Sequence, residues 1–395
     1  MKFAVVNLGC KVNRVESDTI AAACLARNYG EVSPVDADVV FINTCTVTGE
    51  AEKKTRKAVH RVLRENTLAR VVVTGCAAAI APEVFLAMDK RVVVEPDKSK
   101  VISAVEDFDI TRSDFSLLRV GQVFPTRVGV KVQDGCNNAC TYCIVHVARG
   151  RATSRTLDDV VREVREYADV GTKEIVLTGI NLGSYNCGGV RLADLLSTLL
   201  SATSKVRFRI SSIEPRDVDD ALIDLLAQSD GRVCRHLHLP LQAGSAKVLR
   251  EMARPYTALD YETLVEKLYA ALPMLSLSTD IIAGFPGETD SDFEETLALA
   301  RRCRFSKIHT FPYSRRAGTP AAARLDQVDP LVKSARAVLL RQLGEELRAQ
   351  EYSKRSGSIE SVLIERHGMA TTESYFEIAV SPDLTVGDLV SMRLP

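Results

Sequence analysis

The chain has 395 residues, 46% of them apolar and 26% charged, and its 51 Lys and Arg balance 51 Asp and Glu. This composition excludes a disordered or collagen-like chain, and zero net charge excludes nucleic-acid binding by bulk charge alone. No apolar run approaches the ~18 residues that span a bilayer, so no membrane contact is expected. Ten Cys are too few for a disulfide-built secreted scaffold, and Asn7 interrupts the short apolar start, so no export signal is expected. We therefore expect a reducing, cytoplasmic compartment, where clustered Cys bind metal or act as thiols.

Residues 1–124 alternate short apolar runs with helix-like segments. Strands rich in Val, Ile and Phe are predicted at 2–7, 38–43, 70–74 and 91–95, and helices at 15–28 and 50–65. This order predicts a Rossmann-like parallel sheet with crossover helices.

Residues 125–330 repeat the strand-then-helix unit. Six strands are predicted, at 127–132, 173–177, 206–210, 235–239, 275–282 and 307–311. The helices between them are predicted at 156–170, 191–201, 218–229, 257–271 and 290–302, the first with Thr156 as its N-cap and Gly171 as its stop. A closed eight-stranded barrel needs ~250 residues, so we expect an open, partial (β/α)6 barrel.

The last part of the chain changes pattern again. Residues 331–354 are amphipathic and predict a linker helix. Residues 355–395 hold short β-like runs at 361–365, 374–380 and 389–394, separated by Gly and Pro-Asp, and predict a small all-β module.

The strongest motif is a C-x3-C-x2-C spacing directly after a predicted strand, formed by Cys136, Cys140 and Cys143. Three thiolates within eight residues need a metal, and thiolates suit zinc or iron–sulfur clusters. A structural zinc site wants four ligands, usually from paired C-x2-C elements. Three ligands without a nearby fourth favour a [4Fe–4S] cluster with one open iron.

A second set of three Cys is scattered in sequence, as Cys10, Cys45 and Cys76, each a few residues after a predicted strand. Because the carboxyl ends of parallel strands share one sheet edge, these thiols converge there and predict a second three-ligand cluster. Any one of them alone would be interpreted as a buried core thiol. The remaining four Cys lack this context and are interpreted as packing residues or chance surface thiols: Cys24, Cys187, Cys234 and Cys303.

The C-x3-C-x2-C loop on a partial barrel resembles the radical S-adenosylmethionine superfamily. The resemblance implies that the open iron binds S-adenosylmethionine, that the three Cys are catalytic, and that Tyr142 lies near the adenine. Two Cys trios, the scattered one first, resemble the methylthiotransferase family over nearly the whole chain, with a TRAM-like C-terminal module. Further stretches resemble this family at 135–138, 148–151, 177–181, 239–242 and 284–289.

Within this family, residues 8–13 (Leu-Gly-Cys-Lys-Val-Asn), 179–185 and 211–215 resemble the branch that acts on N6-threonylcarbamoyladenosine at position 37 of tRNA. The resemblance implies two [4Fe–4S] clusters: one generates a radical that removes hydrogen from adenine C2, and the other carries the inserted sulfur, which a second S-adenosylmethionine methylates. It also implies a tRNA anticodon stem-loop, a reducing electron donor and a sulfur donor as partners. We expect a monomer.

Three polar residues lie just after predicted barrel strands: Asn181, Glu214 and Gln242. Carboxyl ends of barrel strands carry ligand contacts, so we expect these residues, with Tyr142, to bind the cofactor. The alternative is that each is a loop polar group that meets water.

One feature disagrees with an RNA substrate. Residues 356–395 contain six Asp and Glu but two Arg, a net charge of −4, whereas a module that grips RNA should be basic. This charge favours a basic protein substrate, so the alternative is methylthiolation of a ribosomal-protein side chain, or another radical reaction. Basic residues elsewhere are interpreted as RNA contacts or an ordinary solvated face: Arg149, Arg151, Arg155, Arg315, Arg316, Lys354 and Arg355.

Two rival classes are weaker. A radical enzyme with a cobalamin domain would want a His to approach cobalt, and the first His is His60. A non-enzymatic zinc or iron–sulfur RNA-binding protein would want a strongly basic face or fully ligated metal sites.

Overall fold

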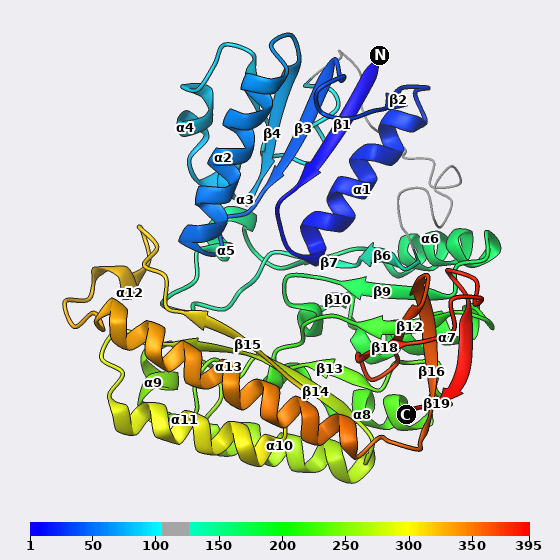
Figure 1. Ribbon diagram of the computed structural model, residues 1–395, viewed down its shortest axis with the longest axis vertical. Coiled ribbons are helices and arrows are strands. Elements are labelled where there is room, and N and C mark those ends of the chain that lie inside the picture. The colour runs from blue at the N-terminus through cyan, green and yellow to red at the C-terminus, as the bar shows by residue number, and fades with distance from the viewer. Residues whose placement is uncertain (105–125) are drawn as a thin grey trace.

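The computed structural model describes residues 1–104 and 126–395, which form an N-terminal α/β domain, a central barrel and a C-terminal sheet (Figure 1). The predicted domain boundary at 124/125 lies outside the described residues. Among those that are described, no helix is long and apolar enough to cross a membrane.

The N-terminal domain is a five-stranded parallel sheet in the order β2-β1-β3-β4-β5. Its strands are β1 (Lys2–Asn7), β2 (Gly30–Glu31), β3 (Val39–Thr44), β4 (Arg70–Gly75) and β5 (Val92–Val94), and its helices are α1 (Lys11–Leu25), α2 (Gly49–Glu65), α3 (Cys76–Ile80) and α4 (Pro82–Leu86). Side chains alternate along each strand, so β3 packs Ile42 with Val59 of α2 in one core and Phe41 with Ile20 of α1 in another. The Rossmann-like prediction is therefore confirmed.

The central unit is the predicted partial barrel. Its six parallel strands are β6 (Val128–Lys131), β9 (Glu174–Thr178), β12 (Arg207–Ile210), β13 (His236–His238), β14 (Ser276–Ala283) and β15 (Lys307–Pro312). They form two three-stranded sheets, β6-β9-β12 and β13-β14-β15, which isolated parallel bridges join at Phe208–Val233 and Ser212–His238. The described residues show no pairing between β6 and β15, so the barrel stays open.

Helices cover the outside of this barrel. The main ones are α6 (Leu157–Asp169), α7 (Leu192–Ala202), α8 (Asp220–Gln228), α10 (Ala258–Ala271) and α11 (Asp290–Cys303). The predicted N-cap is confirmed, because the Thr156 hydroxyl accepts a hydrogen bond from the Asp159 amide of α6. Shorter elements connect them: β7 (Gln133–Asp134), α5 (Val145–Arg149), β8 (Thr153–Ser154), η2 (Leu182–Ser184), β10 (Asn186–Cys187), β11 (Val190–Arg191), η3 (Pro215–Asp217), α9 (Ala246–Glu251) and α12 (Pro320–Ala323).

Helix α13 (Pro330–Ser353) crosses β15 and leads to the C-terminal sheet, at the right of the barrel in Figure 1. That sheet is antiparallel, in the order β18-β17-β16-β19, with β16 (Ile359–Arg366), β17 (Met369–Thr372), β18 (Glu377–Ala379) and β19 (Leu389–Arg393). Two buried barrel arginines hold it in place: Arg207 donates to the Ser361 carbonyl, and Arg209 to those of Thr372 and Glu373.

Two sequence-based elements differ in their bounds. The strand predicted at 374–380 is present but shorter, as β18 (Glu377–Ala379), because it is preceded by a turn in which Tyr375 adopts a φ of +69°. Its partner β17 (Met369–Thr372) was not predicted. The helix predicted at 15–28 begins four residues earlier, at Lys11, with Cys10 as its N-cap.

Candidate active site

The C-x3-C-x2-C loop lies between β7 and α5, at the carboxyl end of the first barrel strand. Its entry is tightly packed: Gly135 has a φ of +70°, and a Cβ there would lie 2.0 Å from the Arg151 carbonyl oxygen. The Cys136 amide also donates to the Gly150 carbonyl at 3.1 Å. Only glycine combines the positive φ with this close approach of the backbone at position 135. The packing at Gly135 and the hydrogen bond from Cys136 hold the entry of the loop in place.

Each sulfur of this loop accepts one hydrogen bond. The donors are the Asn138 amide to Cys136 (3.4 Å), the Val145 amide to Cys143 (3.4 Å), and Arg254 Nη1 to Cys140 (3.1 Å). Donors that point at sulfur suit thiolates bound to a cluster. Burial raises the pKa of Cys136 and raises that of Cys143 to about 11, so these groups are thiols until a metal displaces their protons.

These three thiols line one cavity of about 360 Å³, which we call the thiol cavity. All four residues predicted to bind the cofactor line it as well: Tyr142, Asn181, Glu214 and Gln242. The volume and the mixture of thiols, an aromatic ring, a carboxylate and amides suit a cluster with a nucleoside cofactor.

Arg254 is the residue of this cavity that the sequence did not reveal. Its guanidinium donates to Cys140 Sγ and to the Tyr142 hydroxyl (3.3 Å), and it forms an ion pair with Glu214. Asn138 Nδ2 donates to the other Glu214 oxygen at 2.8 Å. Arg254 follows the short helix α9 with no motif around it, so only the fold brings it to the loop.

The N-terminal trio, Cys10, Cys45 and Cys76, follows three neighbouring strands, β1, β3 and β4. Cys45 and Cys76 are buried, whereas Cys10 is exposed. Burial raises the pKa of Cys45, and the nearby Cys10 and Cys76 raise it further, so the three thiols share one neighbourhood. Gly75 makes this possible, because a Cβ there would lie 2.4 Å from the Thr44 carbonyl oxygen.

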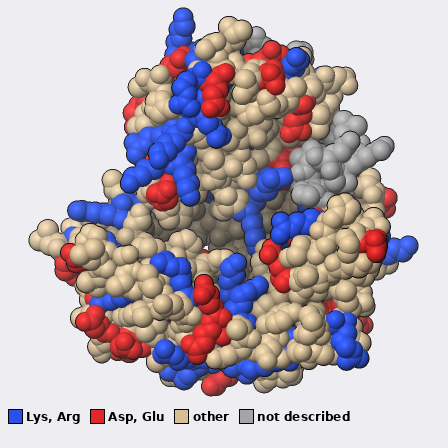
Figure 2. All heavy atoms as spheres, viewed as in Figure 1, with Lys and Arg blue, Asp and Glu red and all other residues tan. Residues whose placement is uncertain are grey.

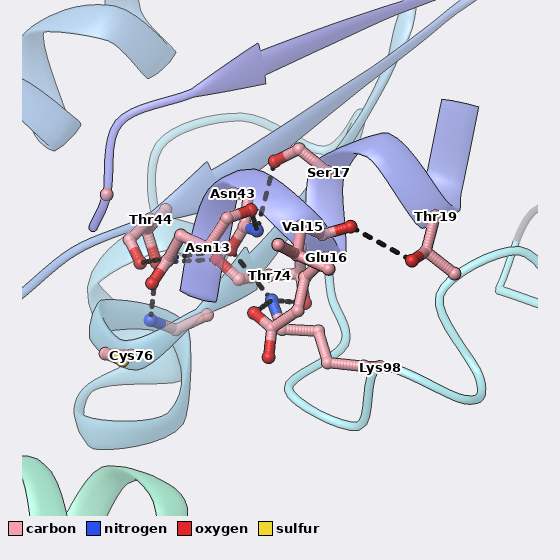
Figure 3. Close-up of polar contacts among 12 residues, drawn as sticks. Asn13, Val15, Glu16, Ser17, Thr19, Asn43, Thr44, Thr74, Cys76 and Lys98 are labelled. Carbon is pink, nitrogen blue, oxygen red and sulfur yellow. Dashed lines mark hydrogen bonds and ion pairs between the residues drawn. The ribbon is translucent and has the colours of Figure 1, made fainter. Parts of the chain in front are cut away.

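A buried polar frame holds the three loops together (Figure 3). Asn13 Nδ2 donates to Asn43 Oδ1 and to the Thr44 carbonyl, each at 2.9 Å. Asn43 Nδ2 donates back to the Asn13 carbonyl at 2.8 Å, and the Thr44 hydroxyl donates to the Thr74 carbonyl at 2.6 Å. The start of α1 and the ends of β3 and β4 are therefore fixed relative to each other.

Arg149 joins the N-terminal trio to the barrel. It is the last residue of α5, the helix that follows Cys143, and its Nε lies 3.3 Å from Cys76 Sγ. Its Nη1 pairs with Glu16 (2.7 Å) and Asp134 (3.1 Å). Although burial acts to raise it, Lys131, Arg149 and Lys98 hold the pKa of Glu16 well below its ordinary value. One charged network thus spans the domain junction beside a candidate ligand.

In neither trio do the three sulfur atoms lie within 4.8 Å of one another. Among the described residues, the group of three His, Cys, Asp or Glu side chains whose ligand atoms do lie that close is His238, Asp280 and His309. Four ligands of one zinc lie about 2.0–2.3 Å from it and therefore close together, whereas cluster thiolates each bind a different iron. The sequence drew no attention to this His–Asp–His group, which lies on three successive barrel strands.

One thiol of the N-terminal trio, Cys10, reaches the thiol cavity. Cys10, together with Val47 and Thr48 from the loop after Cys45, lines the thiol cavity alongside the three Cys of the radical loop. A group bound by the N-terminal trio would therefore face the same space as a cofactor bound at the radical loop.

The interpretation of the basic residues as RNA contacts or solvated face is wrong for three of them. The side chains of Arg149, Arg316 and Arg355 are at most 10% exposed. Arg316 pairs with Glu52 of α2 at 2.8 Å, and Arg355 with Glu351 at 3.1 Å. These cations hold parts of the protein to one another.

The predicted packing role of the other Cys agrees with their burial. Cys24, Cys234 and Cys303 are at most 1% exposed, and Cys187 packs at the edge of the barrel core.

Comparison with known proteins supports two of these units. Residues 130–300 match the model of the Radical SAM superfamily, and residues 2–95 match the Uncharacterized protein family UPF0004. The chain is 37% identical to the threonylcarbamoyladenosine tRNA methylthiotransferase MtaB of Chlamydia pneumoniae, over 99% of this chain and 95% of that protein. It is 36% identical to the tRNA-2-methylthio-N(6)-dimethylallyladenosine synthase of Carboxydothermus hydrogenoformans, over 92% and 88%.

The fold is also similar to that of a solved structure, the radical S-adenosylmethionine methyltransferase TsrM from Kitasatospora setae with cobalamin and [4Fe-4S] cluster bound. The TM-score is 0.58 at 15% identity, over 81% of this chain and 77% of that one. At this identity the likeness concerns the fold alone.

Proposed function

Because the chain belongs to the methylthiotransferase family of radical S-adenosylmethionine enzymes, we propose that it adds a methylthio group to C2 of N6-threonylcarbamoyladenosine at position 37 of tRNA. The full-length match to MtaB proteins and the branch-like residues around Cys10 support this choice of substrate. The enzyme uses S-adenosylmethionine and two [4Fe–4S] clusters, one at each Cys trio.

The reaction needs a radical because an aromatic C–H has no acidic proton for a general base. When bound, the cofactors supply a 5′-deoxyadenosyl radical to remove the C2 hydrogen, and the sulfur and methyl group that replace it. The protein has to bind and orient the reactants and exclude water around them.

The side chains of the thiol cavity divide this work. Cys136, Cys140 and Cys143 would hold the radical-generating cluster, and Arg254 donates a hydrogen bond to Cys140 Sγ. Tyr142 would bind the adenine of the cofactor. Glu214, which is held by Arg254, would accept from its ribose hydroxyls.

Asn181 and Gln242 also line the thiol cavity. Their side-chain amides would donate to the polar groups of the cofactor. Asn181 is already oriented, because its Nδ2 donates to Asp217 at 2.8 Å.

The observation that carries this proposal is the position of Cys10 in the thiol cavity. A methylthio transfer requires the sulfur donor and the substrate carbon radical to meet in one closed space. Cys10 of the N-terminal trio lines the cavity in which the radical would form. A protein that used only one of the two clusters would not need this arrangement.

The acidic C-terminal tail is less of an objection than its charge suggests. Three of its six acids face inward: Glu365 pairs with Arg127, Glu373 with Arg235 (2.9 Å), and Glu360 lies 3.7 Å from Arg355. Glu365 and Glu373 attach the module to the barrel, whereas Glu360 contacts Arg355 in the segment between α13 and β16. The three carboxylates are therefore unavailable to a basic protein substrate.

Nucleoside mass spectrometry of tRNA from cells that lack the gene tests the proposal. We expect the methylthio derivative of threonylcarbamoyladenosine to disappear and to return when the gene is supplied. Unchanged methylthio-threonylcarbamoyladenosine would refute the substrate, and loss of a methylthio group from a ribosomal protein would support the alternative.

A further inference from the structure

A second cavity, of about 460 Å³, is separate from the thiol cavity, and none of the six Cys of the two trios lines it. It lies where α1, the barrel strands β6, β9 and β12, and the C-terminal sheet meet, and Tyr375 stands on its wall. We call it the Tyr375 cavity. On the face shown in Figure 2, a hollow opens between the N-terminal domain and the barrel, and Lys and Arg side chains lie at its rim.

Three cations surround the Tyr375 ring. Arg209, Lys11 and Arg127 lie 4.7, 5.2 and 5.7 Å from its centroid. The turn that holds the ring has a positive φ at Tyr375, a conformation that costs a non-glycine residue about 1–3 kcal/mol and that clusters at ligand sites. The C-terminal sheet thus places one aromatic ring, at a cost, into a cation-rich space.

Among the described residues, one of these three cations has no ionic partner. Arg209 pairs with buried Glu174 at 2.7 Å, and Arg127 pairs with Glu365. Lys11 makes no hydrogen bond or ion pair within the part of the chain that the structure describes, apart from its contact with the Tyr375 ring. Lys11 is an exposed residue that lines the Tyr375 cavity, so its ammonium is accessible to a ligand there.

The two cavities adjoin at consecutive residues. Cys10 lines the thiol cavity and Lys11 lines the Tyr375 cavity. Because the Cα atoms of consecutive residues lie about 3.8 Å apart, the linings of the two cavities approach each other at the start of α1.

The two kinds of tRNA substrate named for the relatives differ at one place. Threonylcarbamoyladenosine carries a threonine carboxylate on N6, whereas dimethylallyladenosine carries an uncharged apolar group. A cation that has no ionic partner among the described residues attracts the threonine carboxylate. It gains no charge interaction with the dimethylallyl group.

On the basis of the proposed function, we propose that the Tyr375 cavity binds the N6 substituent of the substrate, with Lys11 pairing with its carboxylate and the Tyr375 ring packing beside it. Lys11 is then a specificity-determining residue that separates anionic from apolar N6 groups. The C-terminal sheet serves this selection by supplying Tyr375.

The test measures binding of anticodon stem-loop RNA to the cluster-loaded protein. Three RNAs are compared: one with threonylcarbamoyladenosine, one with its carboxylate converted to a carboxamide, and one with dimethylallyladenosine. We expect the wild type to bind the first about 10- to 100-fold more tightly than the second, which is the usual range for one charge-assisted hydrogen bond.

Lys11→Gln should reduce the affinity ratio between the threonylcarbamoyl RNA and the carboxamide RNA to about twofold or less. Its binding of the carboxamide RNA should stay unchanged, because the Lys11 ammonium and the threonine carboxylate form one pair, and the carboxamide RNA already lacks that pair. Lys11→Arg should retain most of the ratio. Lys205→Gln, at an exposed position before β12, is the matched control and should behave as the wild type. Iron content of each variant checks that the neighbouring Cys10 still holds its cluster.

The outcomes separate this inference from the proposed function. If the wild type methylthiolates the threonylcarbamoyl RNA but Lys11→Gln keeps the full ratio, the Lys11 contact is refuted and the proposed function stands. If the wild type forms no product with that RNA, the proposed function fails, and the inference fails with it.

Discussion

Replacing Arg149 with Met tests whether the charged network holds the domain junction together. Arg149 gives Glu16 two hydrogen bonds, at 2.7 and 3.1 Å, and the Glu16 side chain is only 4% exposed. Breaking a buried ion pair costs about 3–5 kcal/mol, but Lys131 (3.0 Å) and Lys98 (3.6 Å) still pair with Glu16. We therefore expect the variant to lose about 3 kcal/mol of unfolding free energy, at the low end of that range.

The loss should depend on pH. Because Lys131, Arg149 and Lys98 hold the pKa of Glu16 below its ordinary 4.5 despite burial, this carboxylate stabilises the fold above pH 4.5, and the stabilisation fades as the pH falls. The difference between wild type and Arg149→Met should accordingly shrink in acid.

Urea unfolding of the reduced apoprotein measures the free energy at pH 7.5 and at about pH 2.5, because the lowered pKa of Glu16 keeps its carboxylate largely ionised at pH 4. Arg151→Met changes the same residue type two positions away, on an exposed side chain, and should leave the free energy within about 0.5 kcal/mol of the wild type. Equal stability of the two variants at pH 7.5 would refute the reasoning.

Three further predictions follow from the same geometry. Replacing the N-terminal trio with Ala should leave one cluster and retain cleavage of S-adenosylmethionine while abolishing methylthio transfer, as iron analysis and mass spectrometry would show; retained transfer would contradict the role of the trio. Arg254→Met should slow 5′-deoxyadenosine formation about tenfold or more through the loss of a charge-assisted bond to Cys140, whereas Arg250→Met, on an exposed face of α9, should not. Burial raises the pKa of Asp18 to about 7 despite Arg14, so Asp18→Asn should stabilise the protein at pH 8 by at most about 4 kcal/mol and have little effect at pH 4; thermal scans that show the opposite trend would contradict this.

Much of the fold was predictable because its strands are short, continuous apolar runs. Such runs are typical of parallel sheets buried on both faces, and the alternation of strand and helix then fixes the class. The C-x3-C-x2-C loop was equally visible, since its spacing is local. The strand-end rule brought Cys10, Cys45 and Cys76 to one edge because β1, β3 and β4 are neighbours in the sheet.

The remaining parts of the site depend on tertiary contacts that no local pattern carries. Arg254 reaches Cys140 across 114 residues, and Arg149 reaches Cys76 across 73. The acidic tail was misleading for the same reason, because net charge does not show that Glu365 and Glu373 point at barrel arginines. Residue type alone could not separate a solvated cation from one that joins two domains.

The central claim is that two Cys trios share one reaction space and methylthiolate a threonylcarbamoyl-adenosine. The most direct measurement incubates the anaerobically reconstituted enzyme with S-adenosylmethionine, a reductant and the threonylcarbamoyl stem-loop, and analyses the nucleosides by mass spectrometry. The account predicts a methylthio group on C2 of that base, formed together with 5′-deoxyadenosine. Formation of 5′-deoxyadenosine with an unmodified base would contradict it.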